Sequence, residues 1–181
     1  VEHALRSWKA QDFEQAAADR GLVASALRSF AQWDVHPHAQ AIAAQALLTL
    51  ERIGDAPPLA LPTLGADQLP LTGLRVLDLT RIVAGPVAGR TLAALGADVL
   101  LVNAPHLPNI ALIAETSRGK LSCHLDLHTP DHRQSMDALV SEADVFVQGY
   151  RPGGLEALGY GAQALAERRP GIVVVSLSAY G

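Results

Sequence analysis

The spacing of hydrophobic positions changes along the chain and separates a first region, residues 1–54, from the rest of the sequence. Within it, apolar residues at 13–18 and 41–48 recur at the spacing of amphipathic helices. Residues 33–38, Trp-Asp-Val-His-Pro-His, interrupt this pattern with a proline and polar neighbours, which favours a helix boundary. The pattern therefore predicts a helical segment over residues 1–54.

A second region, residues 55–69, has no hydrophobic period and is rich in proline. Pro57, Pro58 and Pro62 fall inside it, and Pro70 follows directly. Because proline cannot donate a backbone hydrogen bond, this density excludes both a continuous helix and a central strand. We expect an extended linker that lies on a surface.

The third region, residues 70–181, alternates strand patterns with helix patterns. Thr129 and Pro130 are typical of a helix start, with threonine as N-cap and proline at the first position. Such alternation predicts an α/β fold, a Rossmann-like open parallel sheet with flanking helices, preceded by the helical segment and the Pro-rich linker. The predicted strands are 74–79, 98–102, 121–127, 144–147 and 172–177, and the main predicted helices are 87–95 and 130–143.

Composition narrows the function classes. Hydrophobic residues make up 49% of the 181 residues and charged residues 18%, which is ample for a packed core. The net charge of −4, with no clustered basic face, argues against a general nucleic-acid surface. No apolar run approaches the roughly 18 residues that a membrane span needs. Cys123 is the only cysteine, which fits a reducing cytosol, and we expect a cytoplasmic protein.

The two ends of the sequence suggest a piece of a longer polypeptide. The chain begins without methionine, and it stops at Tyr180-Gly181, directly after an apolar strand pattern. We therefore expect further chain on both sides.

Three loops could carry chemistry, because ligands of open parallel sheets bind at the carboxyl ends of strands. Residues 80–86 join the first strand to its helix and place Arg81 where a phosphate or carboxylate is favoured. Residues 118–120, Arg-Gly-Lys, could clamp a phosphate, and residues 148–154 combine an aromatic side chain, a cation and several glycines. Each loop is also compatible with a plain connection, and the turn at 80–86 has neither a G-x-G-x-x-G nor a P-loop pattern.

Other reactive residue types do not form a catalytic or metal set. His36 and His38 stand in a Pro-broken loop with no Cys or acidic cluster to complete a metal site. Asp78 and Asp126 lie within strand patterns, where a carboxylate commonly accepts from backbone N–H groups. The strand pattern around Cys123 indicates a small, buried apolar residue rather than a nucleophile. We nominate no catalytic residue and expect no metal.

Taken in order, several short motifs of the third region resemble family III CoA-transferases. This group includes formyl-CoA transferase, carnitine CoA-transferase of the L-carnitine dehydratase type, and α-methylacyl-CoA racemase. The likeness extends over about 110 residues. The segments that carry it are 70–81 (PLTGLRVLDLTR), 84–86 (AGP), 95–99 (LGADV), 119–120 (GK), 125–127 (LDL), 143–147 (ADVFV), 151–153 (RPG), 158–160 (LGY) and 170–173 (PGIV).

The resemblance implies coenzyme A or an acyl-CoA as substrate, with a small carboxylic acid as the second substrate. Two departures concern this ligand: Asn103-Ala104 replaces the family's common Glu-Arg, and Gly149-Tyr150 replaces its frequent Asn-Phe. By position, the family's contacts to the nucleotide end of CoA fall at Arg81, Ile82, Val83, Ala84, Lys120, Gly149, Tyr150, Ala157 and Leu158.

From this resemblance we expect the family's catalytic Asp beyond the last residue of this sequence. The resemblance thus implies the CoA-binding portion of an acyl-CoA:carboxylate CoA-transferase. An acyl-CoA racemase of the same family and a non-catalytic CoA-binding or assembly module stay open as alternatives. Family members form interlocked homodimers, which we expect of the full-length protein. Residues 1–54 more loosely resemble the tail of a preceding, degenerate family unit.

Overall fold

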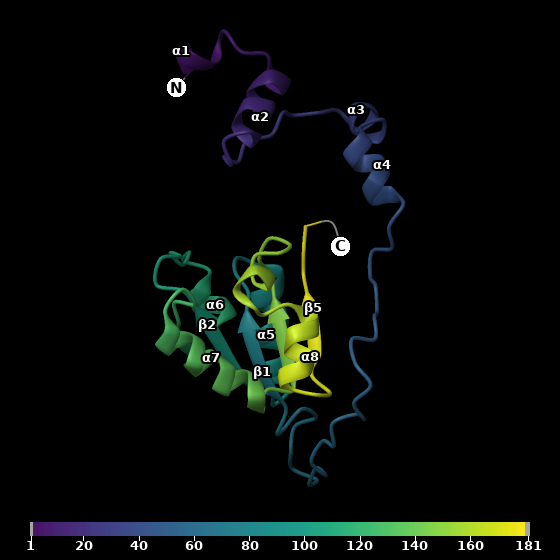
Figure 1. Cartoon of the computed structure of the whole chain (residues 1–181), viewed down its shortest axis with the longest axis vertical. Helices are drawn as coiled ribbons and strands as arrows, with labels where there is room; N and C mark the ends of the chain where they lie inside the picture. Colours follow the sequence, from purple (N-terminus) through teal and green to yellow (C-terminus); the bar gives the residue numbers. More distant parts are fainter. Residues whose placement is uncertain (1, 180–181) are drawn as a thin grey trace. The chain divides into compact units, whose positions relative to one another are not determined.

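The structure is a computed structural model that describes residues 2–179 and divides the chain into two compact units, with the division between Leu47 and Leu48. The first unit is helical, as its hydrophobic pattern predicted, although the second predicted run ends earlier, at Ala43 rather than near residue 48. Its helices are α1 (Glu2–Leu5), α2 (Ala10–Ala18), α3 (Phe30–Asp34) and α4 (Pro37–Ala43) (Figure 1).

One carboxylate organises the connection between α2 and α3. Glu14 Oε1 accepts from the backbone N–H of Ala26 at 3.0 Å and from Arg28 Nη1 at 2.9 Å. These hydrogen bonds, led by the one from Arg28, lower the pKa of Glu14 to about 2. Ser29 then starts α3 through a capping box with Gln32.

The second unit begins with the Pro-rich stretch. Residues 51–65 form neither helix nor strand, as the prolines require. The stretch nevertheless packs on the unit, because a Cβ added at Gly171 would lie 3.1 Å from Leu59 Cγ. A Cβ added at Gly73 would likewise lie 2.6 Å from Pro62 Cγ.

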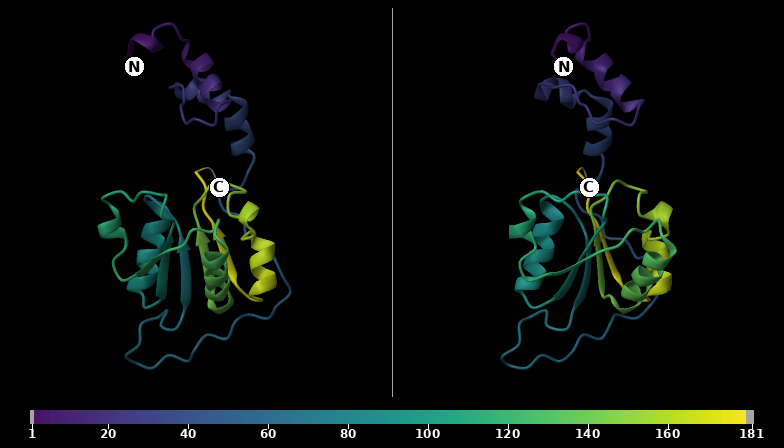
Figure 2. Two further views of the ribbon diagram at one scale, coloured as in Figure 1. Left: turned by 60° about the vertical axis from the view of Figure 1, so that its left-hand side comes forward. Right: turned by 90° about the vertical axis from the view of Figure 1, so that its left-hand side faces the viewer.

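An open parallel sheet with helices on both faces forms the rest of this unit, which confirms the predicted fold class. Within the described residues the strand order is β3-β2-β1-β4-β5. Figure 2 shows α5 and α6 on one face and α7 and α8 on the other. The strands are β1 (Arg75–Leu79), β2 (Asp98–Asn103), β3 (Leu121–His124), β4 (Val145–Gln148) and β5 (Val173–Ser176), and the helices are α5 (Ala84–Ala94), α6 (Ile113–Thr116), α7 (Pro130–Glu142), the 3₁₀ turn η1 (Glu156–Leu158) and α8 (Ala162–Arg168).

The strands β1 and β4 are buried on both sides, which explains their nearly continuous apolar sequences. Phe146, Met136, Val140 and Leu165 are fully buried in the larger core cluster between the sheet and the α7 and α8 helices. A smaller cluster around Val76 and residues packed against it occupies the other side. The sheet is therefore a rigid base for the loops at its carboxyl edge.

Two element boundaries of this unit differ from the sequence prediction by three residues, and both differences shape that edge. Helix α5 starts at Ala84 rather than Val87, so the turn after β1 is short. Strand β3 ends at His124 rather than residue 127, because Asp126 organises a turn there. Its Oδ1 accepts from the N–H of His128 at 3.0 Å, and its carbonyl oxygen accepts from the Thr129 hydroxyl.

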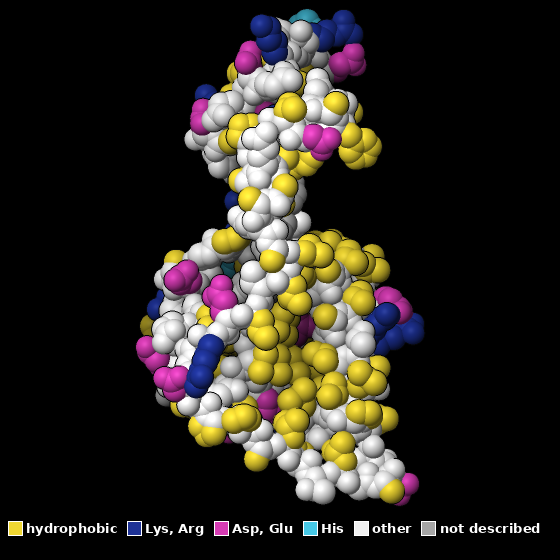
Figure 3. All heavy atoms as spheres, turned by 90° about the vertical axis from the view of Figure 1, so that its right-hand side faces the viewer, with side chains coloured by type: hydrophobic (Ala, Val, Ile, Leu, Met, Phe, Trp, Pro, Cys, Tyr) yellow, Lys and Arg dark blue, Asp and Glu magenta, His cyan; other side chains and the backbone are white. Residues whose placement is uncertain are grey.

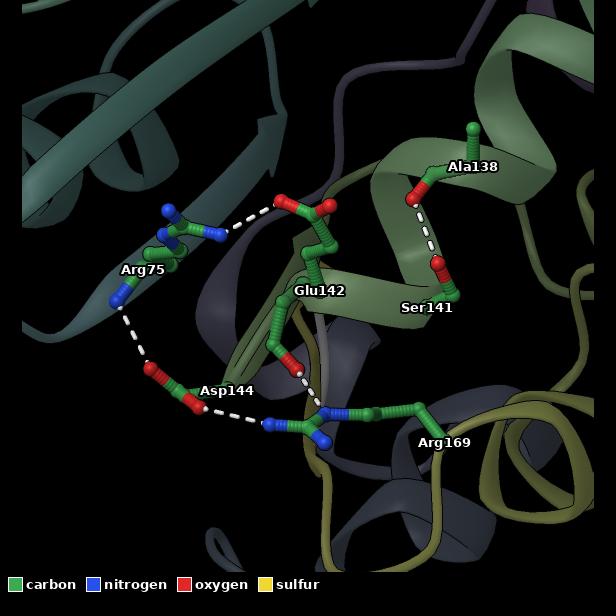
Figure 4. A network of polar contacts seen from close by, with 7 residues as sticks. Arg75, Ala138, Ser141, Glu142, Asp144 and Arg169 are labelled. Atoms are coloured by element: carbon green, nitrogen blue, oxygen red, sulfur yellow. Dashed lines mark hydrogen bonds and ion pairs between the residues drawn. The ribbon is translucent and has the colours of Figure 1, made fainter.

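A polar network closes the opposite, amino-terminal edge of the sheet (Figure 4). Asp144 Oδ2 accepts from the backbone N–H of Arg75 at 2.9 Å, and Asp144 Oδ1 accepts from Arg169 Nη2 at 3.2 Å. Arg169 Nε also donates to the Ala143 carbonyl at 3.0 Å. This network ties β1, β4 and the entry to β5 together, far from the loops at the carboxyl ends of the strands.

Candidate functional site

A cavity of about 510 Å³ lies where β1, β2, β3 and β4 end. Its position between β1 and β4 is the switch point of the sheet, where the chain starts to add strands in the opposite direction. Ligand sites of ordinary size range from about 300 to 1,000 Å³. The lining residues are Leu79, Arg81, Val102, Asn103, Ala104, His106, Leu107, Leu125, Leu127, His128, Tyr150, Arg151, Gly154, Leu155 and Leu158.

The lining combines an apolar floor with basic side chains. Leu79, Val102 and Leu127 are buried members of the larger core cluster. Two arginines, Arg81 and Arg151, and two histidines also line the cavity, whereas none of the described lining residues is acidic. Such a site suits a ligand that has an apolar or aromatic part and negatively charged groups.

Arg81 fixes one wall of the cavity. Its Nη2 donates to the Pro108 carbonyl at 2.5 Å and so connects the turn after β1 to the loop after β2. Its guanidinium also acts on Tyr150, which comes from the end of β4. Burial raises the pKa of the Tyr150 phenol, and the positive charge of Arg81 opposes this rise only in part. The phenol therefore stays neutral at physiological pH.

A buried ion pair supports the turn after β1 from below. Lys120 Nζ lies 2.7 Å from Asp78 Oδ2 and donates to the Pro86 carbonyl at 2.8 Å, and both charged side chains are 0% exposed. The other oxygen, Asp78 Oδ1, accepts from the backbone N–H and the hydroxyl of Thr80. One carboxylate thus holds the loop before β3 and the turn after β1 in fixed positions.

Two glycines of α5 allow this close approach. A Cβ at Gly89 would lie 2.3 Å from Asp78 Oδ2, and one at Gly85 would lie 2.4 Å from Thr80 Cβ. The turn also contains Ile82 with φ 76°, a conformation that β-branched residues rarely adopt. The turn is therefore held by its surroundings rather than by its own preferences.

Residues 71–181 match CoA-transferase family III. The chain belongs to this family. A curated acyl-CoA transferase from Gibberella moniliformis is 34% identical over 191 residues, which cover 100% of this chain and 33% of the relative. The probable fatty acyl-CoA transferase Rv3272 from Mycobacterium tuberculosis is 40% identical over 126 residues, 62% of this chain and 32% of the relative.

Solved structures also show similarity to this chain. A crystal structure of Rv3272 from Mycobacterium tuberculosis matches with a TM-score of 0.56 and 42% identity, covering 62% of this chain and 33% of that chain. A CAIB/BAIF family protein from Brucella suis has a TM-score of 0.56 at 34% identity, with 61% and 33% covered. The chain spans about a third of the length of these relatives.

The cavity collects only some of the residues that the family resemblance singled out. Arg81, Tyr150 and Leu158 line it. Lys120 does not, because its ammonium group is buried against Asp78, and it would have to break that pair to reach a ligand. Ile82 lines a neighbouring hollow of about 20 Å³. The remaining residues lie on the exposed surface, and they are Val83, Ala84, Gly149 and Ala157.

Sequence reasoning did not single out several residues that the fold brings to the cavity. His106 and His128 belong to different loops, 22 positions apart, and their ring centroids lie 6.2 Å from each other. The signal that could have indicated them is that each closely follows the end of a strand, β2 and β3 respectively. Leu125 and Leu155 are apolar loop residues whose role depends on the tertiary fold alone.

Two structural features are absent from the described part of the chain, a metal-binding group of side chains and a membrane-spanning helix. Among residues 2–179, no three His, Cys, Asp or Glu side chains are grouped so that they could hold a metal ion. No helix in the same range is both long and apolar enough to cross a bilayer.

Proposed function

We propose that the second unit binds the nucleotide end of coenzyme A or an acyl-CoA in the cavity at the carboxyl ends of β1 to β4. The composition of this cavity carries the proposal. Its leucines and Val102 offer an apolar surface to an adenine ring, and Arg81 and Arg151 offer donors to phosphates. Family membership and relatives named acyl-CoA transferases favour a CoA thioester over other nucleotides.

Within the whole protein, this unit would hold the CoA group while a carboxylic acid and a thioester exchange it. The reacting carboxylate is an Asp outside this chain, which forms acyl–aspartyl and aspartyl–CoA anhydride intermediates in the family. Residues of this chain therefore bind and orient the ligand and take no covalent step. In this proposal, the cavity holds the nucleotide end of the ligand rather than its sulfur.

Calorimetric titration with CoA tests the binding proposal. The variant Arg81→Met/Arg151→Met removes both cavity arginines, and hydrogen bonds to charged groups contribute about 1.5–3 kcal/mol each. We expect the dissociation constant for CoA to rise by at least about tenfold, since a tenfold change corresponds to about 1.4 kcal/mol.

The matched control is Arg118→Met, which removes an arginine whose side chain is 73% exposed and which does not line the cavity. It should leave the CoA affinity unchanged. Equal losses in both variants, or tight binding of a dinucleotide such as NAD with none of CoA, would contradict the proposal.

A further inference from the structure

Two histidines, His106 and His128, lie side by side at the cavity, and the apolar and arginine contacts proposed for CoA do not involve them. Both side chains are exposed, and both line the cavity. Their rings are 6.2 Å apart between centroids and inclined by 51°. Two imidazoles at this separation leave space for a small anion that accepts hydrogen bonds from both.

The backbone at each histidine is fixed even though its side chain is exposed. The loop that contains His106 turns through a hydrogen bond from Leu107 N to the Ala104 carbonyl at 3.0 Å, and Arg81 holds the loop at Pro108. The N–H of His128 is bound to Asp126 Oδ1 at 3.0 Å. The two side chains therefore extend from ordered turns, which reduces the backbone entropy lost on binding.

The charges around the pair favour an anion. Arg81 from the turn after β1 and Arg151 from the segment after β4 share the cavity lining with the histidines. The carboxylate of Asp126, two positions before His128, directs Oδ1 to the backbone N–H of His128. His132 Nδ1 accepts from the N–H of Asp126, and Arg133 donates to the Leu127 carbonyl at 2.6 Å.

The position of the pair indicates which group of a nucleotide it would meet. In doubly wound sheets, the ribose lies near the end of the second strand, where an acidic residue binds free hydroxyls and a basic residue accommodates a ribose phosphate. Here β2 ends in Asn103, with Ala104 next, so no acid is present at that point, and His106 follows. This arrangement suits a phosphorylated ribose.

We propose that His106 and His128 together bind the phosphate monoester on the ribose of the ligand, and that they bind it as imidazolium groups. This inference rests on the proposed CoA binding, because CoA carries such a monoester at its ribose 3′ position. Histidine changes its charge between about pH 5 and pH 8. The two residues thus make the preference for the 3′-phosphate dependent on pH.

The experiment compares CoA with 3′-dephospho-CoA, by calorimetric titration at about pH 6 and about pH 8. In the unaltered protein we expect CoA to bind at least about tenfold more tightly than 3′-dephospho-CoA at the lower pH, as a charge-assisted contact provides. This ratio should shrink several-fold at the higher pH, because neutral imidazoles lose the charge that binds the phosphate.

The variant His106→Gln/His128→Gln should show a ratio near one at both pH values. Because a phosphate monoester itself gains charge above about pH 6, the comparison between protein and variant isolates the contribution of the imidazoles, and it also cancels any effect of His132. The matched control is His124→Gln, an exposed histidine at the end of β3 that does not line the cavity. Thermal unfolding verifies that each variant is folded.

The possible results separate the two proposals. A variant that keeps the full preference for CoA overturns the role of the histidines, and so does an unaltered protein that binds both ligands equally at the lower pH. In either case, CoA binding itself still stands. If neither ligand binds, the proposed function fails, and this inference fails with it.

Discussion

At the scale of single residues, the Asp78–Lys120 pair determines how the site is supported. A buried charge is tolerated only when it is paired and hydrogen-bonded, and here both groups are fully covered. Lys120 contacts the strand β1 and the helix α5 at the same time, through Asp78 and Pro86. We infer that it positions the turn after β1, on which Arg81 stands.

Replacing Lys120 by methionine should strongly destabilise the protein, because the Asp78 carboxylate is then buried without its partner. We expect the free energy of unfolding, measured with urea, to fall by about 3–5 kcal/mol. The double variant Asp78→Asn/Lys120→Met should lose less, since it leaves no unpaired charge.

The control for this prediction is the exposed pair of Arg75 and Glu142, whose side chains are 54% and 69% exposed. Solvent screens such a pair, and Glu142→Gln should cost no more than about 1 kcal/mol. A loss of similar size in Glu142→Gln and Lys120→Met would contradict the role assigned to burial.

At the scale of elements, the sequence was sufficient for the strands and long helices but not for the contacts between them. Periodicity located β1, β2, β4 and β5 to within a few residues, because buried parallel strands are short apolar runs between turn signals. It did not reveal that Lys120 is internal, since a lysine after a glycine is equally typical of a solvated loop. His106 and His128 were not predicted for a related reason: only the pairing of β2 with β3 brings their loops together.

Helix α5 illustrates how packing overrides local propensity. Alanine is a better helix former than glycine by about 1 kcal/mol, so Gly89→Ala in isolation should stabilise α5. In the folded protein the new Cβ would lie 2.3 Å from Asp78 Oδ2 and 2.8 Å from Lys120 Nζ. We therefore expect a net loss of about 1–3 kcal/mol in the free energy of unfolding, measured by urea denaturation.

The comparison variant is Ala88→Gly, at the neighbouring exposed position of α5. It should lose only about 1 kcal/mol, the difference in helix propensity. A stabilised Gly89→Ala protein would mean that Asp78 and Lys120 can move apart without cost, and the buried pair would then not constrain the turn.

At the scale of the whole molecule, the second unit, which contains the sheet and is here called the sheet unit, leaves apolar surface uncovered. Val173, Val175 and Leu177 are 55%, 42% and 40% exposed on and directly after the edge strand β5. Figure 3 shows hydrophobic side chains gathered on one side of the sheet unit. An exposed apolar edge strand readily pairs with another chain. The 181-residue chain should therefore self-associate.

Sedimentation analysis over a range of protein concentrations tests this expectation. The variant Val173→Lys/Val175→Lys should shift the population towards the monomer, because two charges on β5 oppose both strand pairing and apolar contact. The control Ser135→Lys/Ala138→Lys adds the same charge on exposed positions of α7 and should leave association unchanged. If the unaltered chain is a stable monomer at all concentrations, the expectation of self-association is wrong. If both variants reduce association alike, net charge rather than the β5 edge accounts for the result.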